Sequence, residues 1–536
     1  TTKGGTLNLW SSQDADSWDP ARGYYAFVWN LNRLYTRKLV DYAATPGKEG
    51  LKLVPDLAQA EPEISADKLT YTFKLRSGLK WDDGAPITSK DIKYGIERVF
   101  AADVISGGPT YLTGVLDQGQ NYPGPYKDTD PEKLGLKSVT TPDDSTIVFK
   151  LAKPFSDFIY LLAMPGSGPV PQKRDTGAQY GSKPASSGPY MVKEANPGKN
   201  VAFVRNPNWD QATDPIRKAL PDAINLTITT NADDLDQRLL AGTADLDIGQ
   251  TGVQAAARTK LLSDPNLKAN ADTPVTGFLR YAGLTPVAPM NNIDCRKAVI
   301  YAADPTSIQA ARGGEFAGGD IGTSMRPPNI AGSDPNFDPF NRKQGKAQLD
   351  KAKEHMTACG QPNGFNVTIA VRNNRPAEVK TAEALQAALK AANITAKIDQ
   401  FDGAQSASIS GSPDNVRKKG YNIIIGGWGA DYPTGSGYMQ PLADGRFIPK
   451  NGNYNWPEIK DPAIDGLFDQ AAAETDPAKA AAIYTQINQK IMEGAYFLPF
   501  TVDKALNYRN PRLTNVFVHD AFGMVDFQAL GTSDGK

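Results

Sequence analysis

The chain has 536 residues, too many for a single hydrophobic core, and this length predicts two or three domains. Hydrophobic residues make up 40% of the chain and charged residues 22%, which is an ordinary globular composition. The formal net charge of −1 gives no electrostatic reason to expect a nucleic-acid partner, and no apolar run approaches the roughly 18 residues of a membrane span. Position 1 is Thr and not Met, so we expect that a targeting segment is missing from this sequence.

The first region combines a strand with a cluster of aromatic residues. Thr6 to Trp10 alternates as a strand. Four aromatic residues then follow within six positions: Tyr24, Tyr25, Phe27 and Trp29. Their rings could line a ligand pocket, although packing in a core is the commoner use of aromatic side chains.

Residues 52–184 form a compact strand–helix insert in this interpretation. Leu69 to Leu75 alternates as a half-buried antiparallel strand, and Ser145 to Leu151 does the same. Between them, Thr88 and Asp91 have the spacing of a helix N-terminal cap. A stretch dense in Gly, Pro and Ser, from Pro165 to Pro189, marks a crossing between domains.

The following region has the order strand, helix, strand. Ala223 to Thr229 is a β-branched strand, and a helix with an apolar face follows and closes at Gly242. Ala244 to Ile248 begins the next strand. This order predicts a parallel sheet.

A further βαβ unit lies between Phe365 and Ile398. Phe365 to Val371 alternates as a strand, a helix begins at Pro376 and closes at Asn393, and a strand resumes at Ile394. Tyr421 to Ile425 is the natural next strand of the same sheet. The tail from Thr501 carries strand-like residues and is expected to return to the first domain.

The residues after Ile425 are the strongest candidate for a ligand site. The strand is predicted to end at the pair Gly426-Gly427, beyond which come Trp428, Asp431 and Tyr432. Ligands of α/β sheets bind just past the carboxyl ends of such strands. A carboxylate flanked by aromatic surface could hold a cationic group such as an ammonium. The alternative is an Asp that bonds the backbone of its own turn.

No catalytic or metal-binding motif stands out. The two histidines, His355 and His519, are far apart in the sequence, whereas zinc sites need clustered His and Cys. The sequence contains neither a phosphate-binding loop nor a dinucleotide fingerprint. Residues 531–535 match the nucleophile-elbow pattern but lack its strand–turn–helix context and a later His. We therefore expect no enzymatic activity, no metal and no cofactor.

The two cysteines, Cys295 and Cys359, are the whole thiol content of the chain. In a reducing compartment they would stay free, and outside the cytosol they could pair. A bridge would close a loop of about 65 residues, worth on the order of 4 kcal/mol in the chain-entropy model. Their spacing alone does not decide between these states.

Taken together, these segments resemble the large extracytoplasmic solute-binding proteins of peptide-type ABC importers, and the likeness runs through almost the whole chain. The most specific stretch is Leu69 to Val99, and the supporting stretches are 187–190, 240–245, 296–304 and 427–433. The resemblance implies an α/β fold of the two-lobe periplasmic-binding-protein kind (type II), which closes on a ligand like a flytrap, with an extra α+β insert domain. Lobe I would contain 1–51, 185–276 and 501–536, the insert domain 52–184, and lobe II 277–500.

The resemblance also implies a set of ligand-binding residues. Asp431 matches the acid that holds the α-ammonium of a bound peptide in this family, and Tyr24 to Phe27 matches a strand-like edge that pairs with the peptide backbone. Two features depart from the family pattern. Thr434-Gly435 replaces its usual Asp-Pro, and the Ile and Gly residues just before Trp428 include no Arg that could meet a peptide carboxylate. The expected ligand-binding residues are Asp431, Trp428, Gly429, Tyr432, Tyr24, Tyr25, Ala26, Phe27, Asn373 and Phe500.

The function that follows is the capture of oligopeptides, or of a modified peptide, for delivery to the permease subunits of an ABC importer. We expect a monomer outside the cytoplasmic membrane, either free in a periplasm or held by a lipid on a cysteine that precedes this chain, and a Cys295–Cys359 bridge fits that compartment. The alternative within the family is an oligosaccharide, on whose rings Trp428 would stack, or another small solute such as a metal chelate or haem. A third alternative is a hydrolase that acts on peptides or glycosides. A glycosidase would need two carboxylates roughly 5–10 Å apart, and no motif proposes such a pair.

Overall fold

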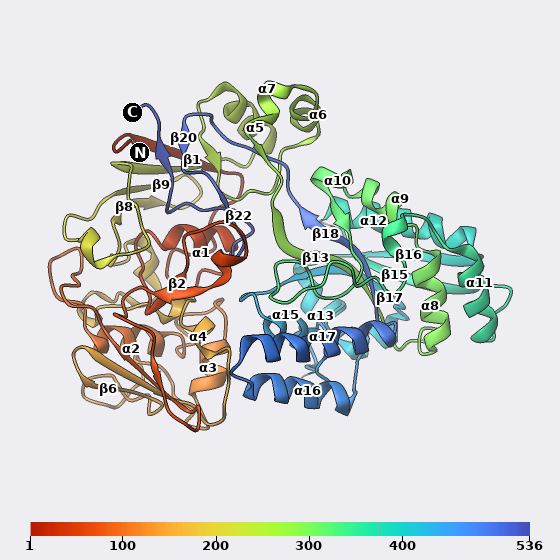
Figure 1. Ribbon diagram of the computed structural model, residues 1–536, viewed down its shortest axis with the longest axis horizontal. Helices are drawn as coiled ribbons and strands as arrows, with labels where there is room; N and C mark the ends of the chain where they lie inside the picture. The colour runs from red at the N-terminus through yellow and green to blue at the C-terminus, as the bar shows by residue number, and fades with distance from the viewer. Residues whose placement is uncertain (1, 374, 447) are drawn as a thin grey trace. The chain divides into compact units, whose positions relative to one another are not determined.

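The computed structural model describes residues 2–373, 375–446 and 448–536, which form two compact units. Unit 1 contains Thr1–Asp272 and Leu506–Lys536, and unit 2 contains Thr273–Ala505. The colours of Figure 1 follow the chain through both units. Among the described residues, no helix is both long enough and apolar enough to cross a membrane.

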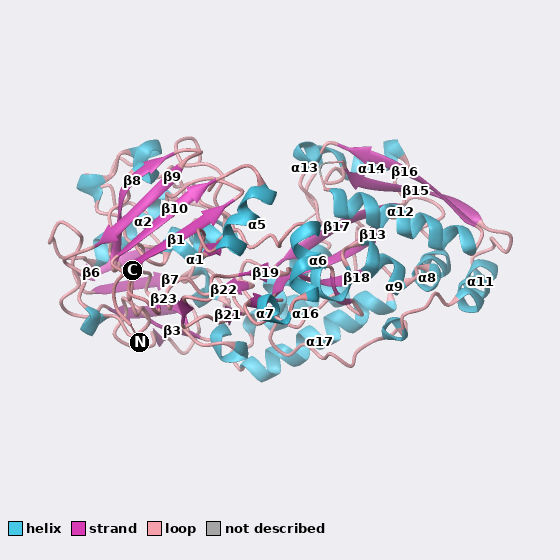
Figure 2. Cartoon of the chain, turned by 90° about the horizontal axis from the view of Figure 1, so that it is seen from above, coloured by secondary structure: helices cyan, strands magenta, loops and turns pink. Residues whose placement is uncertain are grey.

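Unit 1 is built on a five-stranded mixed sheet in the order β11-β1-β10-β9-β8. β1 pairs in parallel with β10 and with β11, whereas β10, β9 and β8 pair antiparallel. Figure 2 shows β8, β9, β10 and β1 as adjacent arrows. The helix α5 (Ala232–Ala241) joins β10 to β11 and ends at Gly242, whose φ of 79° is left-handed. This confirms the predicted strand–helix–strand order with parallel strands. The strand bounds are β1 Thr6–Ser11, β8 Tyr190–Asn196, β9 Asn200–Arg205, β10 Ala223–Ile228 and β11 Leu246–Asp247.

A separate antiparallel sheet in unit 1 has the order β4-β5-β7-β6. Beside it lies α2 (Ser89–Arg98), which begins with the predicted capping box of Thr88 and Asp91 and buries Ile92 and Ile96 completely. The strand bounds are β4 Glu63–Ile64, β5 Thr70–Lys74, β6 Val139–Asp143 and β7 Thr146–Lys150. The remaining α-helices of this unit are α1 Ala26–Asn32, α3 Tyr111–Leu116, α4 Phe158–Leu161, α6 Ala255–Ser263 and α7 Pro265–Lys268.

The C-terminal tail joins unit 1 through short strands and main-chain bonds. β19 (Asn507–Tyr508) pairs with β12 (Ala271–Asp272), and the amide of Thr6 donates to the carbonyl of Lys536 at 2.9 Å. The tail starts a few residues later than position 501, because β18 (Phe497–Lys504) stays in the sheet of unit 2. The other short pairs are β2 Val40–Tyr42 with β3 Leu53–Pro55, β20 Leu513–Thr514 with β23 Gly531–Thr532, and β21 Val518–His519 with β22 Met524–Val525.

Unit 2 is built on a six-stranded mixed sheet in the order β14-β18-β13-β17-β15-β16. β13 is antiparallel to both of its neighbours, while β15 is parallel to β16 and to β17. Within this unit, Figure 1 shows α9, α10 and α12 on one side of the strands and α15, α16 and α17 on the other. The strand bounds are β13 Val275–Leu284, β14 Gly319–Ile321, β15 Phe365–Arg372, β16 Ile394–Phe401 and β17 Ile423–Gly429.

The βαβ unit of the sequence is β15, α12 (Pro376–Ala391) and β16, as predicted. Pro376 takes the first helical position, where its missing N–H costs nothing, and the apolar face of α12 buries Ala382, Leu385 and Leu389. The other helices of unit 2 are α8 Ile293–Ala302, α9 Pro305–Ala311, α10 Gly314–Ala317, α11 Leu349–Ala358, α13 Ser406–Ile409, α14 Pro413–Lys419, α15 Gly435–Ala443, α16 Pro462–Ala473 and α17 Pro477–Glu493.

Candidate functional site

The glycines after Ile425 belong to β17, so the prediction that the strand ends at the glycine pair is wrong. Large side chains from other segments occupy the space that a Cβ atom would need at these positions. A Cβ at Gly426 would lie 2.6 Å from Cη2 of Trp456, one at Gly427 would lie 2.8 Å from Cδ of Arg280, and one at Gly429 would lie 2.9 Å from Cε2 of Phe278. Carbon atoms pack at about 3.5–4.0 Å, so only glycine lets these side chains lie against the strand.

The end of β17 is paired on one side only. Its ladder with β13 continues to the pair Gly429–Phe278, whereas its ladder with β15 contains only Ile423 and Ile424. Within the described ranges, no strand pairs with residues 426–429 on the β15 side. A strand edge of this kind can bind an extended peptide through main-chain hydrogen bonds.

Trp428 lies in this segment and forms an aromatic surface with Tyr454. The two ring centroids are 4.8 Å apart at an angle of 47°, and Tyr454 is 41% exposed. The indole Nε1 of Trp428 is buried and has no hydrogen-bond partner among the described residues. An indole N–H is only a donor, so this atom could pair with an acceptor of a ligand.

Asp431 and Tyr432 follow β17 directly, before α15 begins. Asp431 is half-buried, while Tyr432 is 5% exposed and packs inside the unit. The loop is held by Thr434, whose hydroxyl accepts from the amide of Gly437 and caps α15, and by the amide of Thr434, which donates to the carbonyl of Tyr432 at 2.8 Å. The carboxylate of Asp431 thus follows a strand end, as the sequence pattern predicted.

The segment Tyr24 to Phe27 of unit 1 is not the strand-like edge that the resemblance implied. Tyr24 and Tyr25 lie in a loop and Ala26 begins α1, so the segment is not an extended strand, and the carbonyl of Tyr25 already accepts from the amide of Trp29 at 3.0 Å. The amide of Tyr24 donates to Asp16 at 2.8 Å. Tyr25 is 38% exposed, whereas Phe27 is buried and stacks on Tyr25 at 5.7 Å, so the aromatic cluster provides both core and surface.

Two further expected residues have different surroundings. Asn373 follows β15, is exposed, and donates its backbone amide to the carbonyl of Phe401 at 2.8 Å. Phe500, in contrast, has no exposed surface and belongs to the hydrophobic core of unit 2. Its assignment to the ligand site is therefore corrected, because a ligand cannot reach a fully buried side chain.

Arg280 is a candidate that the sequence pattern did not single out. It lies on β13 directly opposite Gly427, and its Nη2 is 3.4 Å from Oδ2 of Asp503. The signal in the sequence is a lone arginine within the apolar run Phe278–Leu284. The segment directly before Trp428 contains no arginine, and Arg280 reaches this segment from the neighbouring strand β13.

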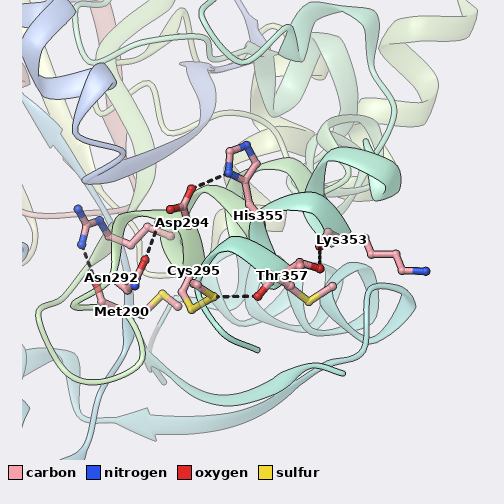
Figure 3. The surroundings of a disulfide bond; sticks show 10 residues. Met290, Asn292, Asp294, Cys295, Lys353, His355 and Thr357 are labelled. Atoms are coloured by element: carbon pink, nitrogen blue, oxygen red, sulfur yellow. Dashed lines mark hydrogen bonds and ion pairs between the residues drawn. A yellow bond between two sulfur atoms is a disulfide. The ribbon is translucent and has the colours of Figure 1, made fainter. Parts of the chain in front are cut away.

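Cys295 and Cys359 form a disulfide that ties α8 to the end of α11 (Figure 3). The Cα atoms are 5.5 Å apart, within the ordinary range for a disulfide. Beside the bridge, Nδ1 of His355 lies 2.8 Å from Oδ1 of Asp294, and the His355 ring stacks on Tyr301 at 5.4 Å. The bridge and these contacts join the same two helices, which indicates that they stabilise this helix pair.

Comparison with known proteins identifies the family. Residues 52–450 match the family described as bacterial extracellular solute-binding proteins, family 5 (middle). The chain belongs to this family. Its members bind solutes outside the cytoplasm, which agrees with the expected location, and the mixed α/β fold is that of two-lobe periplasmic binding proteins.

Relatives of this solute-binding protein cover nearly its whole length. The solved structure of clavulanic acid biosynthesis oligopeptide binding protein 2 is 44% identical, covers 99% of this chain and 96% of its own, and superposes with a TM-score of 0.94. The probable D,D-dipeptide-binding periplasmic protein DdpA of Escherichia coli is 24% identical, over 95% of this chain and 93% of that protein. The glutathione-binding protein GsiB of the same organism is 24% identical, over 96% of this chain and 90% of that protein.

Proposed function

We propose that this solute-binding protein captures a small peptide or modified peptide by its main-chain groups and delivers it to the permease of an ABC importer. The observation that carries the proposal is the 44% identity, over 99% of the chain, to a protein named for oligopeptide binding. The ligands named for the three relatives are an oligopeptide, a D,D-dipeptide and glutathione. These ligands share amide groups, an ammonium and a carboxylate, and differ in their side chains.

The geometry around β17 supports recognition of these shared groups. The unpaired edge of residues 426–429 can bond to ligand amides, the Nε1 of Trp428 can donate to a carbonyl, and the carboxylate of Asp431 can accept from an ammonium. The bond to the ammonium is charge-assisted, and exclusion of water from around the bound ligand would strengthen it. Side chains of the ligand would need no fixed partners, which gives broad specificity.

The decisive experiment compares Asp431→Asn with the wild type by isothermal titration calorimetry, using a peptide with a free amine and its N-acetyl form. Loss of a charge-assisted contact weakens binding of the free-amine peptide by about 2 kcal/mol, or roughly thirtyfold, while binding of the acetylated peptide changes little. Asp350→Asn is the matched control, because Asp350 is an exposed acid on α11 of the same unit. An unchanged dissociation constant for Asp431→Asn would remove Asp431 from the site.

The same titrations address the alternative ligand. The Trp428–Tyr454 surface would stack on sugar rings, and a sugar needs no ammonium partner. An oligosaccharide that binds tightly and equally well to wild type and Asp431→Asn would replace the peptide in this proposal. Mass spectrometry of the purified protein, first native and then denatured, would show which ligand it carries.

Three finer points belong to the same proposal. The protein acts as a monomer, takes no cofactor and releases its ligand unchanged, so incubation with excess peptide should leave the peptide masses intact. The protein lies outside the cytoplasmic membrane, where it is either free or anchored by a lipid on a cysteine upstream of this chain. Mass spectrometry of the protein isolated from its cells would distinguish a lipidated N-terminus from an unmodified one.

A further inference from the structure

Unit 1 contains a pocket that includes none of the expected ligand-binding residues. Its volume is about 610 Å³, within the roughly 300–1,000 Å³ of small-molecule sites. One wall is the turn after β5, with Gly78 and Lys80, and the other is the segment that follows β9, from Arg205 to Gln211. Every lining residue belongs to unit 1, so this unit forms the pocket by itself.

Hydrogen bonds hold the two walls together. Nδ2 of Asn208 donates to the carbonyl of Asp82 at 2.9 Å, which joins the segment after β9 to the turn after β5. Asn206 is 4% exposed, and its Nδ2 donates to the carbonyl of Gly188 at 2.9 Å. Its Oδ1 accepts from the amide of Asn208, also at 2.9 Å. The shape of the pocket is therefore set by contacts within the chain.

Trp209 supplies the aromatic part of the lining and is half-buried. Its Nε1 donates to Oδ2 of Asp214 at 3.1 Å, so the indole N–H is already paired and the orientation of the ring is fixed. What the indole offers to a ligand is thus its ring and not its polar atom. An aromatic ring packs against flat apolar surface, such as the C–H face of a sugar ring.

Most of the remaining lining is polar. Carboxamides both donate and accept hydrogen bonds, as the hydroxyl groups of a sugar do. Ordinary small-molecule pockets are lined predominantly by apolar side chains, so this lining fits a hydrophilic ligand better than an apolar one. Six of the ten lining residues carry a charge or a carboxamide: Lys80, Arg205, Asn206, Asn208, Asp210 and Gln211.

The lining carries two cations and one carboxylate. The Nε of Arg205 lies 3.5 Å from Oδ1 of Asp222, so the charge of this arginine is partly balanced from outside the pocket. Asp210 uses Oδ1 to cap the short 3₁₀-helix that begins at Gln211. Lys80 is exposed, and its Nζ forms no ion pair or hydrogen bond with the described part of the chain. The uncommitted charge of the pocket is positive, which favours a ligand with an acidic group.

We propose that this pocket binds a sugar that carries an acidic group, with Trp209 against the ring and Lys80 against the acid. The site is additional to the peptide site and does not rest on it. Members of the family work outside the cytoplasm, where they meet the sugars of the cell envelope. An acidic peptide would also pair with Lys80, but it would make less use of the indole and the carboxamides.

The probes are methyl β-D-glucuronide and methyl β-D-glucoside, which differ only in a carboxylate against a hydroxymethyl group. Titrations of the full chain, followed by NMR of the ligand, measure both dissociation constants. We expect the glucuronide to bind about two- to fivefold more tightly than the glucoside, because an exposed ion pair contributes little. The N-acetyl amide of aspartic acid has the acid without the ring and should bind at least about tenfold more weakly than the glucuronide.

Variants then locate the binding. Trp209→Ala should weaken binding of the glucuronide at least about tenfold. Lys80→Glu reverses the charge of an exposed side chain and should abolish the preference for the glucuronide, which keeps the test valid if Trp209→Ala does not fold. Lys153→Glu is the matched control, because Lys153 is an exposed lysine of unit 1 outside the pocket lining. Circular dichroism checks that each variant is folded.

The outcomes separate this site from its alternatives. A preference for the glucuronide that disappears in Lys80→Glu and persists in Lys153→Glu supports the proposal. Equal binding of the two glycosides by the wild type, a preference that survives in Lys80→Glu, or the lack of saturable binding of either glycoside overturns it. Binding of the acidic amide as tightly as the glucuronide would replace the sugar by an acidic peptide. None of these outcomes bears on peptide capture.

Discussion

Replacing Gly426 by alanine tests the packing that shapes the candidate site. The new Cβ would lie 2.6 Å from Cη2 of Trp456, about 1 Å inside the normal packing distance. The indole cannot move toward β13, because it also lies against Gly283, where a Cβ would be 2.8 Å from Cε3. Trp456 is 7% exposed and its ring centroid lies 5.8 Å from that of Tyr281. Overpacking of this kind costs about 1–3 kcal/mol, and we expect Gly426→Ala to lower the free energy of unfolding by that amount.

Urea unfolding followed by circular dichroism measures this change, with the slope of the transition checked against the wild type. Gly466→Ala is the matched control, since Gly466 lies inside α16 and nothing lies within 4 Å of its Cβ position. Alanine has the better helix propensity, so this control should gain about 0.5–1 kcal/mol.

A double-mutant cycle identifies the cause. In a Trp456→Leu background the smaller side chain leaves space, and the cost of Gly426→Ala should fall below about 0.5 kcal/mol. If Gly426→Ala is as stable as the wild type, or if its cost is the same with leucine at position 456, then the indole does not exclude a Cβ and the packing argument is wrong.

Three further predictions concern stability. Replacing Cys295 and Cys359 by alanine removes a bridge with a sequence separation of 64 and should lower the free energy of unfolding of unit 2 by about 4 kcal/mol. Dithiothreitol should lower the free energy of unfolding of the wild type to the same value and leave that of the variant unchanged. Burial raises the pKa of Glu97 from 4.5 to about 7, so the folded state binds the proton more tightly than the unfolded state does. The free energy of unfolding of the wild type should therefore fall as the pH rises from about 4.5 through 7. In urea titrations, Glu97→Gln should be more stable than the wild type by about 2–3 kcal/mol at pH 8 and no more stable at pH 4. Burial and the charge of Arg33 lower the pKa of His519 from 6.5, so the unfolded state takes up the proton first and the stability of the folded state falls as the pH drops below 6.5. In thermal melts, the melting temperature of His519→Gln should fall less between pH 7 and pH 5 than that of the wild type.

Much of the fold follows from local sequence signals. The alternation of Phe365 to Val371, the proline at the start of α12 and the capping pair Thr88–Asp91 all act within a few residues, and each gave the element that was expected. The aromatic segment at Tyr24 was harder, because a resemblance suggested an extended edge and the chain instead begins α1 at Ala26. Helix and extended conformations compete closely in such short segments, and packing decides between them.

For the candidate site, local sequence signals predict a carboxylate shortly after a buried strand, within the segment Gly426 to Tyr432. That information is local, since β-strand propensity and the position of a strand end depend on neighbouring residues. The continuation of β17 through its glycines depends on long-range packing, because Trp456, Arg280 and Phe278 come from distant segments and fill the missing Cβ positions. The same holds for the position of Arg280 opposite Gly427 and for the burial of Phe500, since strand register and burial arise when segments far apart in the chain pack together.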